Sequence, residues 1–499
     1  MKKALLVALA VGLVCVWAVP AMAIDWIGFG GFSVKSQLYK NIDYRIATLG
    51  GGSPGSGNPL TAGGLYGFAD PAFNQENWWL QMRGNIYIVA RASADLQGVF
   101  GIEVNSTRFG EAEVAANPSG TAGKWNADAI AIQVKSLYID FKIPSLPVRT
   151  KIGIMPYQLR NPVFLYVDAA GIQANVKIPA GDMVFNINPF WAIMSKGLWT
   201  GVPKVPGAPT DHTTADDANF FGVDVNAVIG DIKPGMFFAF QQQGKYYDGV
   251  GVEGDRQLWW IGGYADMKFG AFAFTGDFVY NGGYDHHKGG AIVTGMEGTF
   301  PGYQFGVPHL SSVRHEAWLT RGVATYAMNK FTFGMGALYG TGDNPGTPNK
   351  NEGYQIPFRS EATKFNDDFL VLMGDWGYRE PYGLQTTGGL FKTWCAPGAG
   401  VWYVRGFADY AVTDWLKLKV NAGYIGDTTH NRDAFSSDLD DDKSVGWEMD
   451  FAVQINIYKN LYFDNAFGYL IGGKAFASQL GGYRTQDPWA FVSCLTYVF

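Results

Sequence analysis

The sequence predicts an all-β protein that forms one closed antiparallel transmembrane β-barrel of about 18 strands. Three observations favour this fold: apolar and polar side chains alternate along many segments, short and long connections alternate along the chain, and the final segment carries one almost wholly apolar face. Alternation indicates strands, because successive side chains of a strand point to opposite faces of the sheet. The barrel must be closed, because a sheet edge in lipid would leave backbone polar groups unpaired.

Three segments show the alternation with few exceptions. In Leu80–Ser93 the even positions are apolar or small, and most of the odd positions are polar. In Trp447–Ile457 the odd positions form the apolar face, and Leu416–Tyr424 sets apolar even positions against lysine, asparagine and glycine. Wide apolar faces opposite polar ones, repeated over many strands, are typical of a barrel with lipid outside and water inside.

Turn signals and polar stretches predict the order of the strands. Short turn signals occur at Ser93–Gln97, Pro144–Pro147, Pro179–Asp182, Gly230–Gly235, Lys268–Ala271, Met328–Phe331, Ala411–Trp415 and Tyr458–Leu461. Between them lie long stretches, roughly 46–78, 108–129, 156–170, 189–217, 243–256, 281–313, 340–400, 427–446 and 471–487. This asymmetry is typical of short periplasmic turns and long extracellular loops, and the connections it defines imply about 18 strands.

Composition excludes several other classes of protein. Glycine accounts for 66 of 499 residues, aromatic residues for 15% and charged residues for 16%. Soluble domains have about 7% glycine and about 25% charged residues. The net charge of −6 gives no basic surplus that would indicate nucleic-acid binding. Outside the first 23 residues, no stretch reaches the ~18 apolar residues that a membrane helix needs.

Both ends of the chain predict export to the bacterial outer membrane. Residues 1–23 have the basic, apolar and small-residue regions of a signal peptide, with cleavage expected after Ala23. At the other end, Trp489–Phe499 resembles the C-terminal insertion signal of outer-membrane barrels, since it alternates and stops on an aromatic residue. We therefore expect residues 24–499 to form a single transmembrane barrel.

Several motifs resemble the alginate-export-type porin family. They are Leu137–Pro144, Val148–Pro156, Val167–Ile172, Tyr339–Asp343, Trp447–Phe451 and Tyr458–Leu461. The chain departs from the family pattern where Met155 replaces a glutamine and Ala169 interrupts an Asp-Gly pair. The resemblance implies the porin architecture, whereas these departures leave the alginate substrate open.

Charged residues on the polar faces are the candidate pore-lining residues. An Arg or Lys that faces lipid at mid-bilayer costs roughly 2–4 kcal/mol, so the alternation assigns these side chains to the lumen. The candidates are Arg83, Arg91, Arg149, Lys151, Lys177, Arg405, Lys417, Lys419, Glu103, Asp140, Glu448 and Asp450. The first five are expected to form a basic patch that attracts anions where the loop at 156–170 narrows the lumen. The alternative interpretation is that these residues are paired wall charges without a selective role.

Other residue groups carry weaker signals. Most of the tryptophans near predicted strand ends are expected to form interfacial girdles, and a carbohydrate-stacking track is the alternative for loop members such as Trp394. These tryptophans are Trp78, Trp79, Trp259, Trp260, Trp394, Trp402, Trp415, Trp447 and Trp489. The acidic run 438–443 could bind Ca²⁺ but lacks EF-hand spacing, and His286-His287 lacks further ligands. We therefore predict no metal, no cofactor and no catalytic residues, because the six histidines lie in no hydrolase motif.

The sequence thus predicts an outer-membrane porin for passive diffusion of small hydrophilic solutes, and it leaves open whether these solutes are anionic. Its expected partners are membrane lipid, lipopolysaccharide and the solutes, without nucleic acid, and its oligomeric state stays open. One alternative is a dedicated exporter of an anionic, alginate-like polysaccharide. Another is a structural or adhesive barrel, plugged by the stretch 340–400, which is long enough to fold inward. An outer-membrane hydrolase is a further alternative.

Overall fold

The computed structural model describes most of the chain. The described residues are 24–40, 76–108, 132–160, 163–195, 217–247, 253–288, 312–344, 347, 349–357, 368–372, 374, 376–379, 400–429, 443–474 and 487–499. The predicted signal peptide, Trp394 of the predicted girdle and residues 438–442 of the acidic run lie outside these ranges. Across these ranges, no helix is long and apolar enough to cross a membrane.

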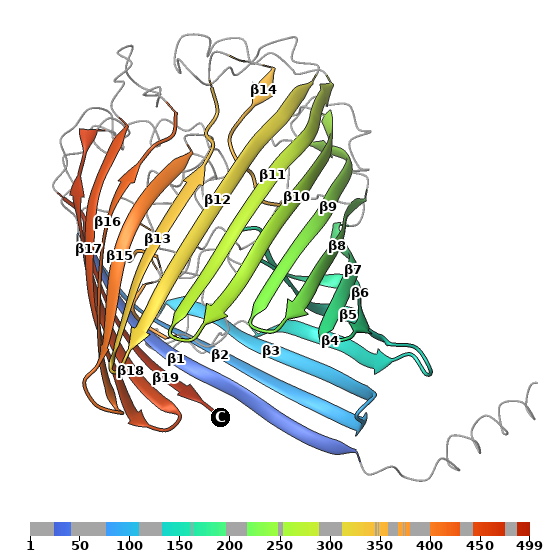
Figure 1. Cartoon of the computed structure of the whole chain (residues 1–499), viewed down its shortest axis with the longest axis horizontal. Coiled ribbons are helices and arrows are strands. Elements are labelled where there is room, and N and C mark those ends of the chain that lie inside the picture. Colours follow the sequence, from blue (N-terminus) through green and yellow to red (C-terminus); the bar gives the residue numbers. More distant parts are fainter. Residues whose placement is uncertain are drawn as a thin grey trace, which may run out of the picture.

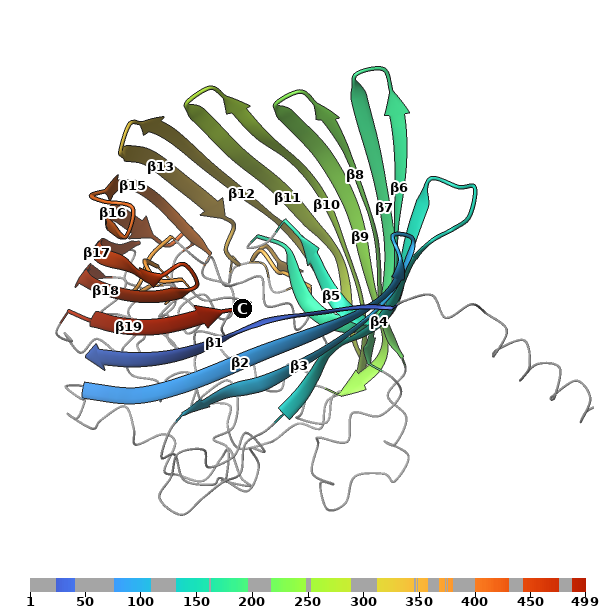
Figure 2. The ribbon, with the colours of Figure 1, turned by 90° about the horizontal axis from the view of Figure 1, so that it is seen from below.

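The described residues form a closed ring of antiparallel strands (Figures 1 and 2). In chain order the strands are β1 Asp25–Lys40, β2 Glu76–Ser93, β3 Leu96–Arg108, β4 Ile132–Lys142, β5 Val148–Leu159, β6 Leu165–Ala180, β7 Met183–Ser195, β8 Ala218–Ile229, β9 Ile232–Tyr247, β10 Glu253–Phe269, β11 Phe272–Lys288, β12 Val313–Met328, β13 Phe331–Gly340, β14 Lys350–Asn351, β15 Val401–Ala411, β16 Leu416–Gly426, β17 Ser444–Tyr458, β18 Leu461–Gly472 and β19 Trp489–Val498. Eighteen of these 19 described strands make the wall, and β14 adds a short parallel pairing to β12. The prediction of a closed antiparallel barrel of about 18 strands is confirmed.

The first and last strands close the ring. β1 and β19 pair from Gly31 opposite Val498 to Lys40 opposite Trp489. Beyond this register, the Gly30 N–H donates to the Phe499 carbonyl at 2.9 Å, and the Phe499 N–H donates back at 3.0 Å. This pairing satisfies the backbone groups that an open sheet would expose to lipid.

Strand alternation separates an apolar exterior from a mixed interior. Along β1, Ser33, Lys35 and Gln37 are buried, whereas Phe32 and Val34 are exposed. Other strands also present large apolar side chains outward, including Leu137, Ile139, Met236, Ile261, Phe278, Met335, Val404 and Phe451. An apolar band on the outside is what a lipid-embedded barrel requires.

The structure corrects two details of the sequence interpretation. The predicted loop at 156–170 is mostly strand, because β5 continues to Leu159 and β6 begins at Leu165. Trp260 is fully buried and belongs to the interior core, so its assignment to an interfacial girdle was wrong. The eight predicted short turns do lie between consecutive strands.

Cross-strand contacts between glycine and aromatic residues help to explain why both residue types are abundant. In eight described pairs an aromatic ring lies over the glycine directly opposite on the neighbouring strand: Gly84–Phe32, Gly101–Tyr87, Gly222–Phe190, Gly235–Tyr264, Gly262–Phe237, Gly282–Trp259, Gly334–Phe407 and Gly426–Trp402. A Cβ added at any of these glycines would lie 2.0–2.7 Å from the ring. The ring thus covers the backbone that glycine leaves bare, an arrangement that stabilises glycine in sheets.

We predict that Gly334→Val destabilises the barrel, because the new side chain displaces the Phe407 ring. Overpacking of this kind costs on the order of 1–3 kcal/mol. The temperature at which the folded protein loses its fast electrophoretic mobility should fall. Gly98→Ala is the matched control, since a Cβ there meets nothing within 4 Å. Equal transition temperatures for Gly334→Val and the unsubstituted protein would contradict the prediction.

Candidate functional site

The predicted pore-lining residues lie in three environments inside the barrel. Arg83, Glu103, Asp140, Arg405, Glu448 and Asp450 are buried. Arg149, Lys151 and Lys419 are half-buried on the inner wall. Arg91, Lys177 and Lys417 are exposed, close to the short turns. The alternation thus brings charges to the interior, but it does not bring all twelve residues to one place.

On the wall formed by β2 to β6, most of the candidate charges are paired. Arg83 forms an ion pair with Glu103, and Arg149 Nε donates to Asp140 Oδ1 at 2.6 Å. Lys135 joins the same network, with Nζ 2.8 Å from Asp168 Oδ2 and 3.7 Å from Glu103 Oε2. These contacts favour the interpretation of several candidates as paired wall charges.

Alternation does not predict Lys135 as a pore-lining residue, because a bulge reverses the direction of its side chain. Gly101 pairs with Ser136, and Ile102 pairs with Val134, so Lys135 is an extra residue in β4. A bulge re-aims one side chain and therefore interrupts the alternation on which the prediction depended. The sign in the sequence is that this lysine has the same parity as Leu137 and Ile139, which are apolar.

Part of the stretch 340–400 folds into the barrel and covers the acidic residues of β17. We call the described residues 368–372, 374 and 376–379 the inward segment. Its residues Phe369–Leu372 are almost wholly buried. Glu448 accepts backbone hydrogen bonds from Val371, at 2.5 Å, and from Leu372, at 2.9 Å. Glu448 and Asp450 therefore lie on the inner face but contact this segment.

Asp368 anchors one end of the inward segment. Its fully buried carboxylate accepts hydrogen bonds from Arg321 Nη2, at 3.1 Å, and from Arg405 and Tyr403. Asn421 Nδ2 donates to the Asp368 carbonyl at 2.8 Å. A buried carboxylate is tolerated only when it is paired and hydrogen-bonded, and here two guanidinium groups provide that pairing.

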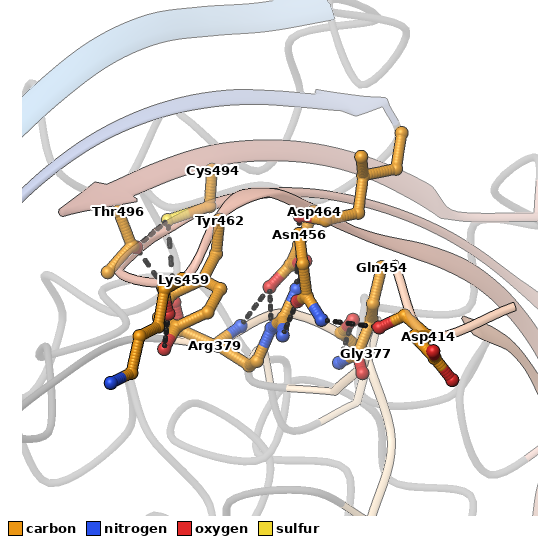
Figure 3. Close-up of polar contacts among 11 residues, drawn as sticks. Gly377, Arg379, Asp414, Gln454, Asn456, Lys459, Tyr462, Asp464, Cys494 and Thr496 are labelled. Carbon is orange, nitrogen blue, oxygen red and sulfur yellow. Dashed lines mark hydrogen bonds and ion pairs between the residues drawn. The ribbon is translucent and has the colours of Figure 1, made fainter. Parts of the chain in front are cut away.

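Arg379 anchors the other end (Figure 3). Its guanidinium donates to both carboxylate oxygens of Asp464, at 2.6 and 2.8 Å, and to Asn456 Oδ1 at 2.6 Å. The Arg379 carbonyl accepts a hydrogen bond from Thr496 Oγ1 at 2.9 Å. Figure 3 also shows Gln454, whose Nε2 donates to the Gly377 carbonyl at 3.1 Å. The segment is thus fixed to β17, β18 and β19 at this end.

A second inward element is the tip of the β5–β6 hairpin. Arg160 lies at the tip and forms two ion pairs. Its Nε lies 2.5 Å from Oδ1 of Asp277 on β11, and its Nη1 lies 2.9 Å from Oδ2 of Asp266 on β10. The Phe164 ring packs 4.5 Å from the Phe237 ring and also contacts Trp260. The tip therefore lies on the inner wall of β9 to β11, and the expected narrowing beside the basic patch stays a prediction.

The stretch after β13 covers the hairpin tip. Tyr354 Oη donates to the Val163 carbonyl at 2.8 Å, and Trp260 Nε1 donates to the Gln355 carbonyl at 2.7 Å. Burial raises the pKa of Tyr354, so its hydroxyl keeps the proton that this hydrogen bond requires. Two connections that are far apart in the sequence thus meet inside the barrel.

A cavity of about 240 Å³ lies beside the hairpin. Its lining includes Arg149, Lys151, Asn175, Asn188 and Asp224. The amides form a chain: Asn175 donates to Asn188 at 2.5 Å, and Asn188 donates to Asp224 at 3.0 Å. The cavity therefore offers cationic donors from β5 and amide groups from β6 and β7 to a hydrophilic solute.

The described residues hold no group of three or more His, Cys, Asp or Glu side chains that could bind a metal ion. The predicted absence of catalytic residues and cofactors stays a prediction.

The chain matches no family model and no curated protein. Among solved structures it is similar to OccK8 (OprE) of Pseudomonas aeruginosa, with 11% identity, a TM-score of 0.48, and coverage of 95% of this chain and 98% of that one. It is also similar to OccAB4 of Acinetobacter baumannii, with 10% identity, a TM-score of 0.46, and coverage of 96% and 100%. With sequence identities and TM-scores this low, the similarity supports no conclusion about function.

We predict that Asp368→Ala releases one end of the inward segment. Removing one partner of a buried ion pair costs about 3–5 kcal/mol, because Arg321 and Arg405 then lose their carboxylate. Single-channel recordings should show a larger or noisier current than those of the unsubstituted protein. Asp182→Ala, at an exposed turn, provides the matched control. An unchanged current for Asp368→Ala would contradict the role of Asp368 as an anchor.

Proposed function

We propose that the protein is an outer-membrane porin that lets small hydrophilic solutes diffuse passively through its lumen. The observation that carries the proposal is the closed barrel whose apolar side chains face outward while charged and amide groups line the inner wall of β2 to β8. A barrel of ~18 strands is wide enough to hold water in the space that its inward segments leave. Sec-dependent export, contact with lipopolysaccharide and a single domain over 24–499 are parts of the same proposal.

The plugged barrel is the second candidate, and one observation favours it. The inward segment and the hairpin tip bring apolar side chains into the interior, where Phe164, Phe369 and Trp260 are fully buried. Such a dry core fills part of the lumen. A dedicated exporter related to alginate-export-type porins is supported only by the sequence motifs, and block of the current by an anionic polysaccharide would favour it.

Solute flux distinguishes these candidates. We expect liposomes that contain the purified protein to swell in small sugars, since a porin admits hydrophilic solutes without an energy source. The control is the same protein heat-unfolded before reconstitution. Failure to conduct ions or to admit sugars, even after deletion of residues 368–379, would contradict the porin proposal and favour a plugged barrel.

A modest anion preference is the finer part of the proposal, and Lys151 is the residue that best tests it. Lys151 Nζ lies 5.6 Å from the centre of the Tyr138 ring, and in the described part of the chain it has no carboxylate partner. Its charge is therefore less compensated than that of Arg83 or Arg149.

We predict that Lys151→Ala shifts the reversal potential under a KCl gradient toward cation preference. The shift should shrink as salt rises, because the screening length falls from about 10 Å at 0.1 M to about 3 Å at 1 M. Lys459→Ala, at an exposed turn, should leave the potential unchanged. If Lys151→Ala behaves like this control, Lys151 does not contribute to ion preference.

A further inference from the structure

Two neighbouring strands of the wall separate on the side of the long connections. β4 pairs with β5 only from Leu137 opposite Ile154 to Lys142 opposite Arg149. β4 itself begins at Ile132, which is still paired with Val104 of β3 on its other side. In the described ranges, residues 132–136 thus have no strand partner on their β5 side.

Two glycines allow β5 and β6 to turn away from β4. Gly153 has a φ of 134°, and a Cβ there would lie 2.2 Å from the Leu137 carbonyl oxygen. Its partner on β6 is Gly171, where a Cβ would lie 2.0 Å from the Trp191 carbonyl oxygen. Only glycine fits either position, and Gly153 also needs the positive φ that glycine permits. The bend therefore follows from the sequence at this point.

Beyond the bend, the hairpin lies inside the ring (Figure 2). Met155, Tyr157 and Leu159 are buried, and Tyr157 Oη donates to the Trp191 carbonyl at 2.9 Å. The Tyr157 ring also packs 5.9 Å from the Phe190 ring of β7. This face of the hairpin contacts the inner wall, so the hairpin does not extend the wall next to β4.

The separation lies at the depth of the membrane. A transmembrane strand needs about 9–11 residues, and β4 has 11. Its outward side chains Ile132, Val134, Leu137 and Ile139 are all apolar and all about half exposed or more. An unpaired strand edge in hydrocarbon costs several kcal/mol for each backbone group, unless water reaches it from the lumen.

The side chain of Lys135 lies between β4 and the hairpin of β5 and β6. Its Nζ reaches Asp168 of β6 at 2.8 Å and Glu103 of β3 at 3.7 Å, so its side chain bridges the two sides of the separation. Glu103 also pairs with Arg83. The positive charges of Lys135 and Arg83 balance the negative charges of Glu103 and Asp168, so the cluster presents no net charge to a passing molecule.

We propose that this separation is a lateral opening in the barrel wall, through which uncharged amphipathic molecules pass between the lumen and the membrane. The apolar side chains of β4 contact the apolar body of such a molecule, and the Lys135–Asp168 bridge hydrogen-bonds its polar end. This proposal rests on the proposed porin function, because the opening would add a second route into the water-filled lumen.

Fluorescence quenching tests whether the opening exists. A bimane label is attached at Lys135→Cys in a variant in which Cys395 and Cys494 are serine. We expect quenching both by aqueous iodide and by a doxyl-labelled phospholipid. Leu137→Cys, which points outward, should respond to the lipid quencher alone, and Tyr138→Cys, which points inward, to iodide alone. If another segment or a second copy covers the edge of β4, the label at position 135 responds to one quencher only, which overturns the proposal.

A cleavable cross-link tests passage. In the same background, Lys135→Cys and Asp168→Cys are joined by a disulfide-containing bis-maleimide, and uptake of N-phenyl-1-naphthylamine is followed in intact cells. Uptake by the double-cysteine variant should fall on cross-linking and recover on reduction, whereas the reagent should leave each single-cysteine variant at its own untreated level of uptake. Unchanged uptake after cross-linking overturns the passage.

Ion conductance, measured on the same cross-linked protein, separates this proposal from the porin proposal. We expect the current to persist when the opening is bridged. A protein that never conducts contradicts the water-filled channel, whereas one that conducts but fails the quenching and uptake tests contradicts only the lateral opening.

Discussion

The structure depends on one constraint, which is that backbone N–H and C=O groups in lipid need partners within the protein. The ring of strands meets this constraint because β19 pairs with β1, where Phe499 and Gly30 exchange two hydrogen bonds. Closure in turn enforces the strict alternation of side chains, because each strand has lipid on one side and the interior on the other. The glycine–aromatic pairs keep neighbouring strands in register within this ring.

Inside the ring, the inward elements follow a second rule, which is that the charged side chains Asp368, Arg379 and Arg160 each meet an opposite charge on the wall. The inward segment brings a carboxylate, Asp368, to two wall arginines, and a guanidinium, Arg379, to the wall carboxylate Asp464. The hairpin tip repeats the pattern with Arg160 and two aspartates. Because an unpaired buried charge is costly, these pairs specify where each element lies as well as holding it there.

Alternation predicted the strands and the interior position of Arg83 or Glu448, because it is a local property of the chain, and turn-forming residues predicted the short turns. Alternation failed at Lys135, where a bulge adds one residue. Trp260 was assigned to a girdle from its position near a predicted strand end, but it packs with a distant connection. Residues 156–159, at the end of β5, were predicted as part of the loop at 156–170. The length of the stretch 340–400 indicated that it could fold inward, and the apolar run Phe369–Leu372 was a further sign. The partners of this run come from strands that no local pattern identifies.

A closed sheet fixes the circumference of a barrel but not the shape of its cross-section, which can flatten. The inward segment joins β12 and β15, through Asp368, to β18 and β19, through Arg379, and so acts as an internal strut across that arc. On the opposite arc, only six residue pairs join β4 to β5. When the surrounding bilayer changes thickness or tension, the barrel should therefore deform unevenly, with most of the strain taken up between β4 and β5.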